Sequence, residues 1–212
     1  MGNSYIFYHI YCNDHTLPIV KDQITKIVFS GLYSHVNSIY CFLSGNIENI
    51  NIVQSYINNQ GAKFIIVDVG ENDTSYERFT LLKIKYFIKE DDIFLYFHTK
   101  GVTKPNSDAV YTWRNIMEYF LIGKYNECIS KLHEYDTVGI MWNNMPWPHF
   151  SGNFWWSTGK YFLSLPNYIN PYEYLAPEAY IGTNAPSHFS FYQTSDNCYE
   201  TYIPFSKYID LH

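Results

Sequence analysis

The stretch that decides the fold is "DDIFLYFHTKGV", residues 91–102. Residues 93–97 are strand-forming and nearly all apolar, which is typical of a strand covered on both faces, as in a parallel sheet. The chain then turns polar at once, in a tetrad made of His98, Thr99, Lys100 and Gly101. Ligands of open α/β sheets bind in the crevice at the carboxyl ends of the strands. We therefore expect a buried strand that ends in a ligand site.

The segments before the tetrad alternate between strand and helix patterns. Strand patterns cover residues 5–11, 36–45 and 62–70, and helical patterns cover residues 16–33, 47–58 and 74–88. Thr16 is the predicted N-cap of the first helix. Strands separated by helices predict βαβ units and a mostly parallel sheet. The predicted fold class is α/β, with a mostly parallel or mixed central sheet flanked by helices.

After the tetrad, the pattern becomes less regular. It predicts a helix over residues 110–132, broken at Gly123, and a strand over 136–142. The last third is rich in Pro, Asn and aromatic residues, and it predicts loops, short helices and one short strand at 154–157. Because no linker or repeat interrupts the chain, we expect residues 1–212 to form a single domain, and an alternative left open is that this domain is the N-terminal part of a longer protein.

Composition limits the possible partners and the compartment. With 212 residues, 47% of them hydrophobic, the chain can bury a sizeable core. The net charge of −6 and the scattered Lys and Arg residues argue against a nucleic-acid partner. The 22 Tyr and 15 Phe suit sugar rings and nucleobases, although a low-GC genome enriches the same residues. No signal peptide or membrane span is evident, and widely spaced cysteines predict free thiols, so we expect a cytoplasmic protein (host cytoplasm if viral).

The tetrad favours anion binding over metal binding. A metal site needs several ligands at fixed spacing, and one His beside a Lys does not provide them. Lys100 attracts phosphate, and the Thr99 hydroxyl can donate to a phosphate oxygen. The alternative is a strand end capped by ordinary polar residues, and the tetrad alone does not decide between the two.

Three further stretches have both a functional and a structural interpretation. In "HFSGNFWW", residues 149–156, Gly152 allows close backbone approach and Asn153 suits sugar hydroxyls, but a tight turn before a core strand has the same pattern. In "YLAPEAYIG", residues 174–182, Glu178 lies in the first turn of a helix, where acids are common. In "SYERF", Arg78 opens the helix before the tetrad strand, where an Arg is usually solvated.

Taken together, the order of these stretches resembles the GT-A class of glycosyltransferases, which transfer a sugar from a nucleotide-sugar donor. In that class a helix Arg contacts the donor, a turn like "FSGN" lies beside the donor sugar, and a later acid lies under the sugar. The resemblance implies donor binding by Tyr11, Arg78, His98, Thr99, Lys100, Gly152 and Asn153. It also implies the GT-A (nucleotide-diphospho-sugar transferase) fold, with a nucleotide-binding half over residues 1–101 and an acceptor or sugar half over 102–212. Glu178 and Lys100 are the implied catalytic residues.

The blocks "FHTKGV", "HFSGNFWW" and "PEAYIG" are similar to a subgroup of this class in bacteria and large DNA viruses. The subgroup includes a chlorella-virus domain involved in capsid glycan synthesis, and the similarity spans nearly the whole chain. The class normally carries an Asp-x-Asp that holds a divalent metal, and here His98-Thr99-Lys100 takes its place. The class implies Mn²⁺ with UDP, so the ion would use His98, with Asp73 and His188 as reserve ligands. Lys100 could do part of the metal's electrostatic work.

Two functions follow as expectations. The first is a Mn²⁺-dependent glycosyltransferase that moves a hexose or deoxyhexose from a UDP-sugar to a glycan acceptor, acting as a monomer or within a multi-domain chain. An inverting route needs a carboxylate such as Glu178 to take the acceptor proton, whereas the related subgroup favours retention. The second is a non-catalytic carbohydrate- or nucleotide-binding module, which the missing Asp-x-Asp and the aromatic surplus also fit.

Overall fold

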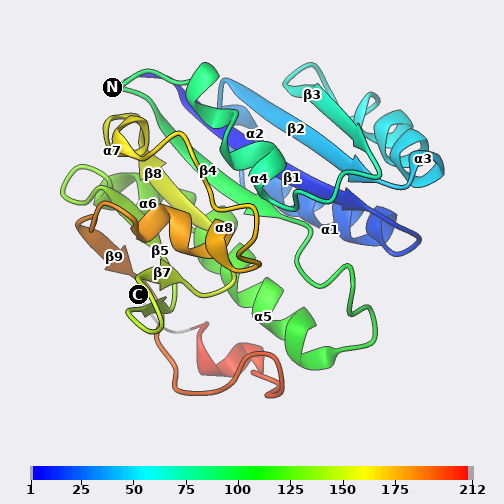
Figure 1. Ribbon diagram of the computed structural model, residues 1–212. Helices are drawn as coiled ribbons and strands as arrows, with labels where there is room; N and C mark the ends of the chain where they lie inside the picture. Colours follow the sequence, from blue (N-terminus) through cyan, green and yellow to red (C-terminus); the bar gives the residue numbers. More distant parts are fainter. Residues whose placement is uncertain (1, 210–212) are drawn as a thin grey trace.

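A seven-stranded sheet forms the centre of the computed structural model, which describes residues 2–209 (Figure 1). The strand order is β3-β2-β1-β4-β8-β5-β9, and β8 runs antiparallel to both of its neighbours. The other pairs in this sheet are parallel. The strands are β1 (Ser4–Cys12), β2 (Ser38–Gly45), β3 (Phe64–Glu71), β4 (Ile93–His98), β5 (Thr137–Gly139), β8 (Trp155–Thr158) and β9 (His188–Ser190). The predicted α/β class with a mostly parallel or mixed sheet is confirmed.

Helices cover both faces of this sheet. The first face packs against α1 (Thr16–Phe29), α2 (Leu32–His35), α3 (Ile47–Ile57), α5 (Asp108–Glu118), a π-helical turn (Tyr119–Gly123) and α6 (Tyr125–Lys131). The second face packs against α4 (Arg78–Leu81), a 3-10 turn (Ile84–Tyr86), α7 (Gly159–Ser164), α8 (Ala176–Ala179) and a 3-10 turn (Tyr180–Gly182). A last 3-10 turn spans Phe205–Lys207.

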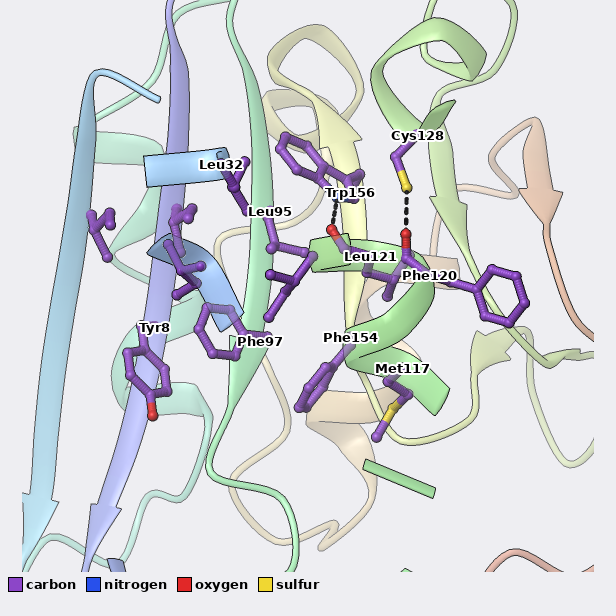
Figure 2. Packing of buried hydrophobic residues seen from close by; sticks show 14 of the residues in the cluster. Tyr8, Leu32, Leu95, Phe97, Met117, Phe120, Leu121, Cys128, Phe154 and Trp156 are labelled. Carbon is purple, nitrogen blue, oxygen red and sulfur yellow. Dashed lines mark hydrogen bonds between the residues drawn. The ribbon is translucent and has the colours of Figure 1, made fainter. Parts of the chain in front are cut away.

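The central strands bury side chains on both faces, as the apolar run in the sequence predicts. In β4, Leu95 and Phe97 belong to the core on the α1 side, whereas Phe94 and Tyr96 belong to the opposite core. Figure 2 shows the first of these cores, in which the Trp156 indole donates a hydrogen bond of 2.8 Å to the carbonyl of Leu121. Burial on two faces holds β4 in the centre of the sheet, and its carboxyl end lies beside that of the parallel strand β1.

Two helices are shorter than the sequence pattern predicts. The helix expected over 16–33 ends at Phe29, because Gly31 adopts a left-handed backbone (φ 87°) and starts the separate helix α2. The helix expected over 74–88 is reduced to α4 and a 3-10 turn. Tyr76 has a positive φ of 54°, which a right-handed helix does not accommodate.

The predicted N-cap of the first helix is wrong. His15 occupies the N-cap position, and Thr16 is the first helical residue. The Thr16 hydroxyl instead donates to the Tyr11 carbonyl at 2.8 Å and accepts from the backbone N–H of Asn13 at 2.8 Å. Its role is therefore to hold the turn between β1 and α1.

The second half contains elements that the sequence pattern shows poorly. The break expected at Gly123 is present, as a π-helical turn followed by α6. The strand expected over 136–142 divides into β5 and β6 (Trp142–Asn143), and β6 pairs with β7 (His149–Phe150). The short strand β9 falls in a segment expected to be loop. All four cysteines are buried free thiols, and none of the helices within residues 2–209 has the length and hydrophobicity needed to cross a membrane.

Candidate active site

A pocket of about 450 Å³ opens at the carboxyl ends of β1 and β4. These two parallel strands are neighbours, and their register places His9 opposite His98. Loops from the second half of the chain close the pocket from the other side. The lining includes Tyr11, Tyr76, Glu77, the whole tetrad, Lys104, Tyr174, Glu178 and Tyr199.

The pocket brings together five of the residues predicted from sequence, namely Tyr11, His98, Thr99, Lys100 and Glu178. Gly152 and Asn153 do not line the pocket but lie directly behind it. The His98 Nε2 atom pairs with the Gly152 carbonyl at 3.0 Å, and the Asn153 amide donates to Glu77 at 2.7 Å. The "FSGN" turn therefore supports the side chains that face the ligand space.

Lys100 carries a buried ammonium group that has no acidic partner among the residues that the structure describes. The residue is 8% exposed, and its Nζ lies 4.0 Å from the centre of the Trp113 ring and 5.3 Å from that of Tyr199. Among residues 2–209 no carboxylate forms an ion pair with this Nζ. Aromatic faces stabilise a cation weakly, by about 0.5–2 kcal/mol. The ammonium therefore remains available to an anion that enters the pocket.

A buried hydrogen-bond network fixes the backbone of the tetrad. Arg114 Nη1 donates to the Lys100 carbonyl at 2.9 Å, and Gln23 Nε2 donates to the His98 carbonyl at 3.1 Å. Glu118 joins these donors, because its carboxylate accepts from Gln23 at 2.8 Å and pairs with Lys26 at 2.5 Å. Burial raises the pKa of Glu118, and the nearby Lys26 opposes that rise. Sequence reasoning missed this network, because its members lie on two helices far apart in the chain.

Two neutral imidazoles lie beside the ammonium. Burial lowers the pKa of His9 to about 4, and burial together with the charge of Lys100 lowers the pKa of His98 to about 3. Because the partner of His98 Nε2 is a carbonyl oxygen, this nitrogen carries the proton and donates. The Thr99 hydroxyl accepts from the Tyr11 amide at 3.1 Å and so connects the ends of β1 and β4.

Glu77 is a pocket carboxylate that sequence reasoning missed. Its Oε2 atom accepts hydrogen bonds from the Tyr96 hydroxyl and the Asn153 amide, both at 2.7 Å. Its Oε1 atom lies 3.8 Å from His98 Nε2, which is too far for a hydrogen bond. The signal was present in the quoted "SYERF", where the resemblance drew attention to the Arg instead.

Arg78, the neighbour of Glu77, does not line the pocket. Its guanidinium is buried and donates to the backbone carbonyls of Asn170 at 3.0 Å and Ser75 at 3.3 Å, and also to that of Glu173. These bonds tie α4 to the loop before α8. The predicted donor contact would require this side chain to leave its carbonyl partners.

The residues predicted as metal ligands do not come together. Asp73 accepts hydrogen bonds from Ser75 in the turn before α4, and His188 stacks on Trp142 with ring centres 3.9 Å apart. Neither residue lines the pocket with His98. In the part of the chain that the structure describes, no group of three or more His, Cys, Asp or Glu could hold a metal ion. The side chains within residues 2–209 therefore do not supply the ligand set of a Mn²⁺ centre.

Tyrosines surround the mouth of the pocket. Tyr76 and Tyr174 meet edge to face, with ring centres 5.3 Å apart, and Tyr199 stands beside Lys100. Tyr174 is 68% exposed, so its ring presents an open face. Glu178 comes from α8 and reaches the same mouth. The pocket therefore combines two lysines (Lys100 and Lys104), two carboxylates and accessible aromatic rings.

The fold and this pocket define an α/β protein with a ligand site at the carboxyl edge of a mixed sheet. Residues 7–200 match the family described as "Domain of unknown function (DUF8361)", and the chain belongs to that family. No curated protein matches the chain.

Solved structures resemble the fold at low sequence identity. HddC from Yersinia pseudotuberculosis has a TM-score of 0.51 at 10% identity, over 91% of this chain and 91% of its own. The 4-diphosphocytidyl-2C-methyl-D-erythritol synthase from Anaerococcus prevotii has a TM-score of 0.47 at 9% identity, over 97% and 93% of the two chains. Another structure, described as a 4-diphosphocytidyl-2C-methyl-D-erythritol synthase, has a TM-score of 0.46 at 8% identity, over 98% of this chain and 96% of its own. At such identities the HddC match shows an α/β fold and nothing about the reaction.

Proposed function

We propose that the protein is a glycosyltransferase that moves a hexose or deoxyhexose from a UDP-sugar to a glycan acceptor. The observation that carries this proposal is the buried ammonium of Lys100, which faces the pocket with no acidic partner among residues 2–209. A nucleotide-sugar is anionic at the diphosphate and rich in hydroxyls at the sugar. The pocket offers a cation for the first part and the carboxylates of Glu77 and Glu178 for the second.

The charge at Lys100 suits the departure of the nucleotide. Transfer breaks the bond between the anomeric carbon and the diphosphate oxygen, and negative charge grows on the leaving diphosphate. A fixed ammonium in a pocket with restricted water stabilises that charge more than bulk water does. Arg114 and Gln23 hold the backbone that carries the ammonium, so the charge is in place before the reaction begins.

Transfer also forms a bond from the anomeric carbon to the acceptor oxygen, and the acceptor hydroxyl loses its proton. In an inverting reaction Glu178 would take that proton, and no hydrogen bond or ion pair of its side chain among the described residues holds the carboxylate elsewhere. In a retaining reaction, which the resembled subgroup favours, the departing diphosphate takes it. Glu178 then contacts a donor hydroxyl.

Mn²⁺ dependence is part of the proposal through the resemblance to the GT-A class. The donor set does not support it, because His98 shares the pocket with neither Asp73 nor His188. Lys100 occupies the end of β4, where that class places its metal-binding acid. The effect of Mn²⁺ on nucleotide affinity therefore needs a direct measurement.

A non-catalytic carbohydrate- or nucleotide-binding module is the second candidate. The absence of a three-ligand cluster within residues 2–209 and the exposed tyrosines at the mouth favour it. The two candidates differ in one measurement. A glycosyltransferase hydrolyses its UDP-sugar slowly without an acceptor, whereas a binding module leaves the donor intact, and a lectin binds free sugar and ignores UDP.

The deciding experiment measures binding of UDP, GDP, CMP and uridine, with and without Mn²⁺, by calorimetry. We expect UDP to bind more tightly than the other three compounds. Lys100→Ala should lower the affinity for UDP by roughly tenfold to a hundredfold, because a hydrogen bond to a charged group is lost, and should leave the affinity for uridine unchanged. Lys160→Ala, in an exposed position on α7 outside the pocket lining, is the matched control. Equal losses of affinity for UDP and for uridine would contradict a contact between Lys100 and the diphosphate.

A further inference from the structure

We infer that Glu77 is the residue that accepts hydrogen bonds from the hydroxyl groups of the transferred sugar. The inference rests on the proposed function and adds a sugar-recognition residue to it. Glu77 lines the pocket beside the tetrad, and its side chain is 17% exposed, so it is sheltered yet reachable.

The carboxylate of Glu77 is fixed in one orientation. Tyr96 and Asn153 both donate to Oε2, which leaves Oε1 without a hydrogen bond among the described residues. Burial raises the pKa of Tyr96 well above its usual value, so this hydroxyl remains a donor at any working pH. A held carboxylate with one open oxygen is suited to accept a hydroxyl at a defined position.

A purely structural carboxylate in such a place would be expected to have a cationic partner. No Lys or Arg forms an ion pair with Glu77 within residues 2–209, and its nearest basic group is His98, which burial keeps neutral. Buried charges are normally paired or hydrogen-bonded on all sides, because desolvation is costly. The open oxygen of Glu77 belongs to a pocket that water reaches, and a ligand hydroxyl can take the place of water there.

Asn153 explains how the "FSGN" turn contributes without touching the ligand space. Its amide donates to Glu77, and its Oδ1 accepts from the Trp155 indole at 2.8 Å. The residue is fully buried, with a positive φ of 57°, so the turn aims the amide at Glu77 rather than at the pocket. Asn153 and Tyr96 are positioning residues that act through Glu77.

The test separates the sugar from the nucleotide. UDP, UDP-glucose and UDP-galactose are titrated into the wild type and into Glu77→Gln, which keeps the shape of the side chain and removes its charge. We expect UDP affinity to stay unchanged, and affinity for at least one UDP-hexose to fall by roughly tenfold to a hundredfold. Tyr96→Phe should give a smaller loss of the same kind, and Glu134→Gln, at an exposed position outside the pocket lining, should change neither.

Each other outcome overturns the inference in a distinct way. Equal losses for UDP and the UDP-hexoses would make Glu77 a support for the pocket, and no loss at all would remove it from the sugar site. A wild type that binds UDP, but neither UDP-hexose more tightly than UDP, contradicts the inference and leaves nucleotide binding intact. A wild type that binds none of the three contradicts the proposed function itself.

Discussion

Individual side chains in the pocket owe their charge states to burial rather than to residue type. His98 and His9 would be partly protonated near neutral pH in water, yet desolvation keeps both neutral. Lys100, two residues after His98, lies against the aromatic faces of Trp113 and Tyr199. Because the two rings are neutral, the positive charge that lines the pocket comes from Lys100 and Lys104.

Glu178 is the residue at which structural and catalytic roles differ most. If it merely begins α8, Glu178→Gln loses a helix-dipole interaction of about 0.3–1 kcal/mol of stability and keeps its activity. If it is the base of an inverting reaction, transfer falls by roughly a hundredfold or more while UDP affinity is unchanged. If it holds a donor hydroxyl, affinity for the UDP-sugar falls together with the rate.

Affinities for UDP and UDP-sugar, measured beside the transfer rate of this one variant, distinguish the three roles of Glu178. We expect one of the two pocket roles, because the side chain lines the pocket beside Tyr174. Unchanged affinities and an unchanged rate per folded molecule would place Glu178 outside the site. Glu173→Gln, an exposed position on the preceding loop, is the control.

Among the elements, the start of α4 shows how neighbouring residues come to serve different purposes. Successive helical residues point about 100° apart. Glu77 therefore faces the pocket, whereas Arg78 turns toward the loop before α8. That loop leads to Glu178, so Arg78 connects the two elements that carry the pocket carboxylates.

We predict that Arg78→Ala acts on stability. Three backbone carbonyls would lose a charged donor, and the free energy of unfolding should fall by at least about 2 kcal/mol. UDP affinity per folded molecule should stay close to that of the wild type. Urea unfolding and calorimetry measure the two quantities, with Lys89→Ala at an exposed position as the control.

The opposite pattern would assign Arg78 to the donor. Unchanged stability with a large loss of UDP affinity would mean that the guanidinium leaves its carbonyl partners when the nucleotide binds. That result would restore the donor contact implied by the resemblance to the GT-A class.

For the molecule as a whole, the two buried histidines couple stability to pH. Their pKa values in the folded protein are about 4 for His9 and about 3 for His98, against about 6.5 in the unfolded chain. The unfolded chain therefore binds protons more readily, and acidification favours unfolding. This contribution to stability is present above about pH 6.5 and is lost progressively as the pH falls toward the folded-state values.

We expect the free energy of unfolding to decrease from about pH 7 to about pH 5, by up to ~1 kcal/mol per pH unit for each histidine. His9→Asn should reduce that slope, while His133→Asn, at an exposed position, should leave it unchanged. Urea unfolding at several pH values provides the measurement. Equal slopes for the wild type and His9→Asn across this range would mean that His9 titrates alike in the folded and unfolded chains.

The α/β class and the position of the pocket at the carboxyl ends of β1 and β4 follow from the local sequence pattern. The apolar run before the tetrad is typical of a strand buried on both faces, and in the structure its alternating side chains do belong to two separate cores. Such a strand places His98, Thr99 and Lys100 at its carboxyl end, where the neighbouring parallel strand also ends. These are local properties, and they can be read from neighbouring residues.

The tertiary structure decided which side chains meet. The Glu77 carboxylate is held in the pocket by hydrogen bonds from Tyr96 and Asn153, which lie 19 and 76 positions away in the sequence. Arg114 and Gln23 reach the tetrad from α5 and α1, and Arg78 turns away from the pocket because carbonyls before α8 take up its donors. These contacts join helices, strands and loops that are far apart in the sequence. A pattern of neighbouring residues therefore cannot predict them. The direction of a side chain at a helix start follows from the backbone turn before it, which here is set by the positive φ of Tyr76.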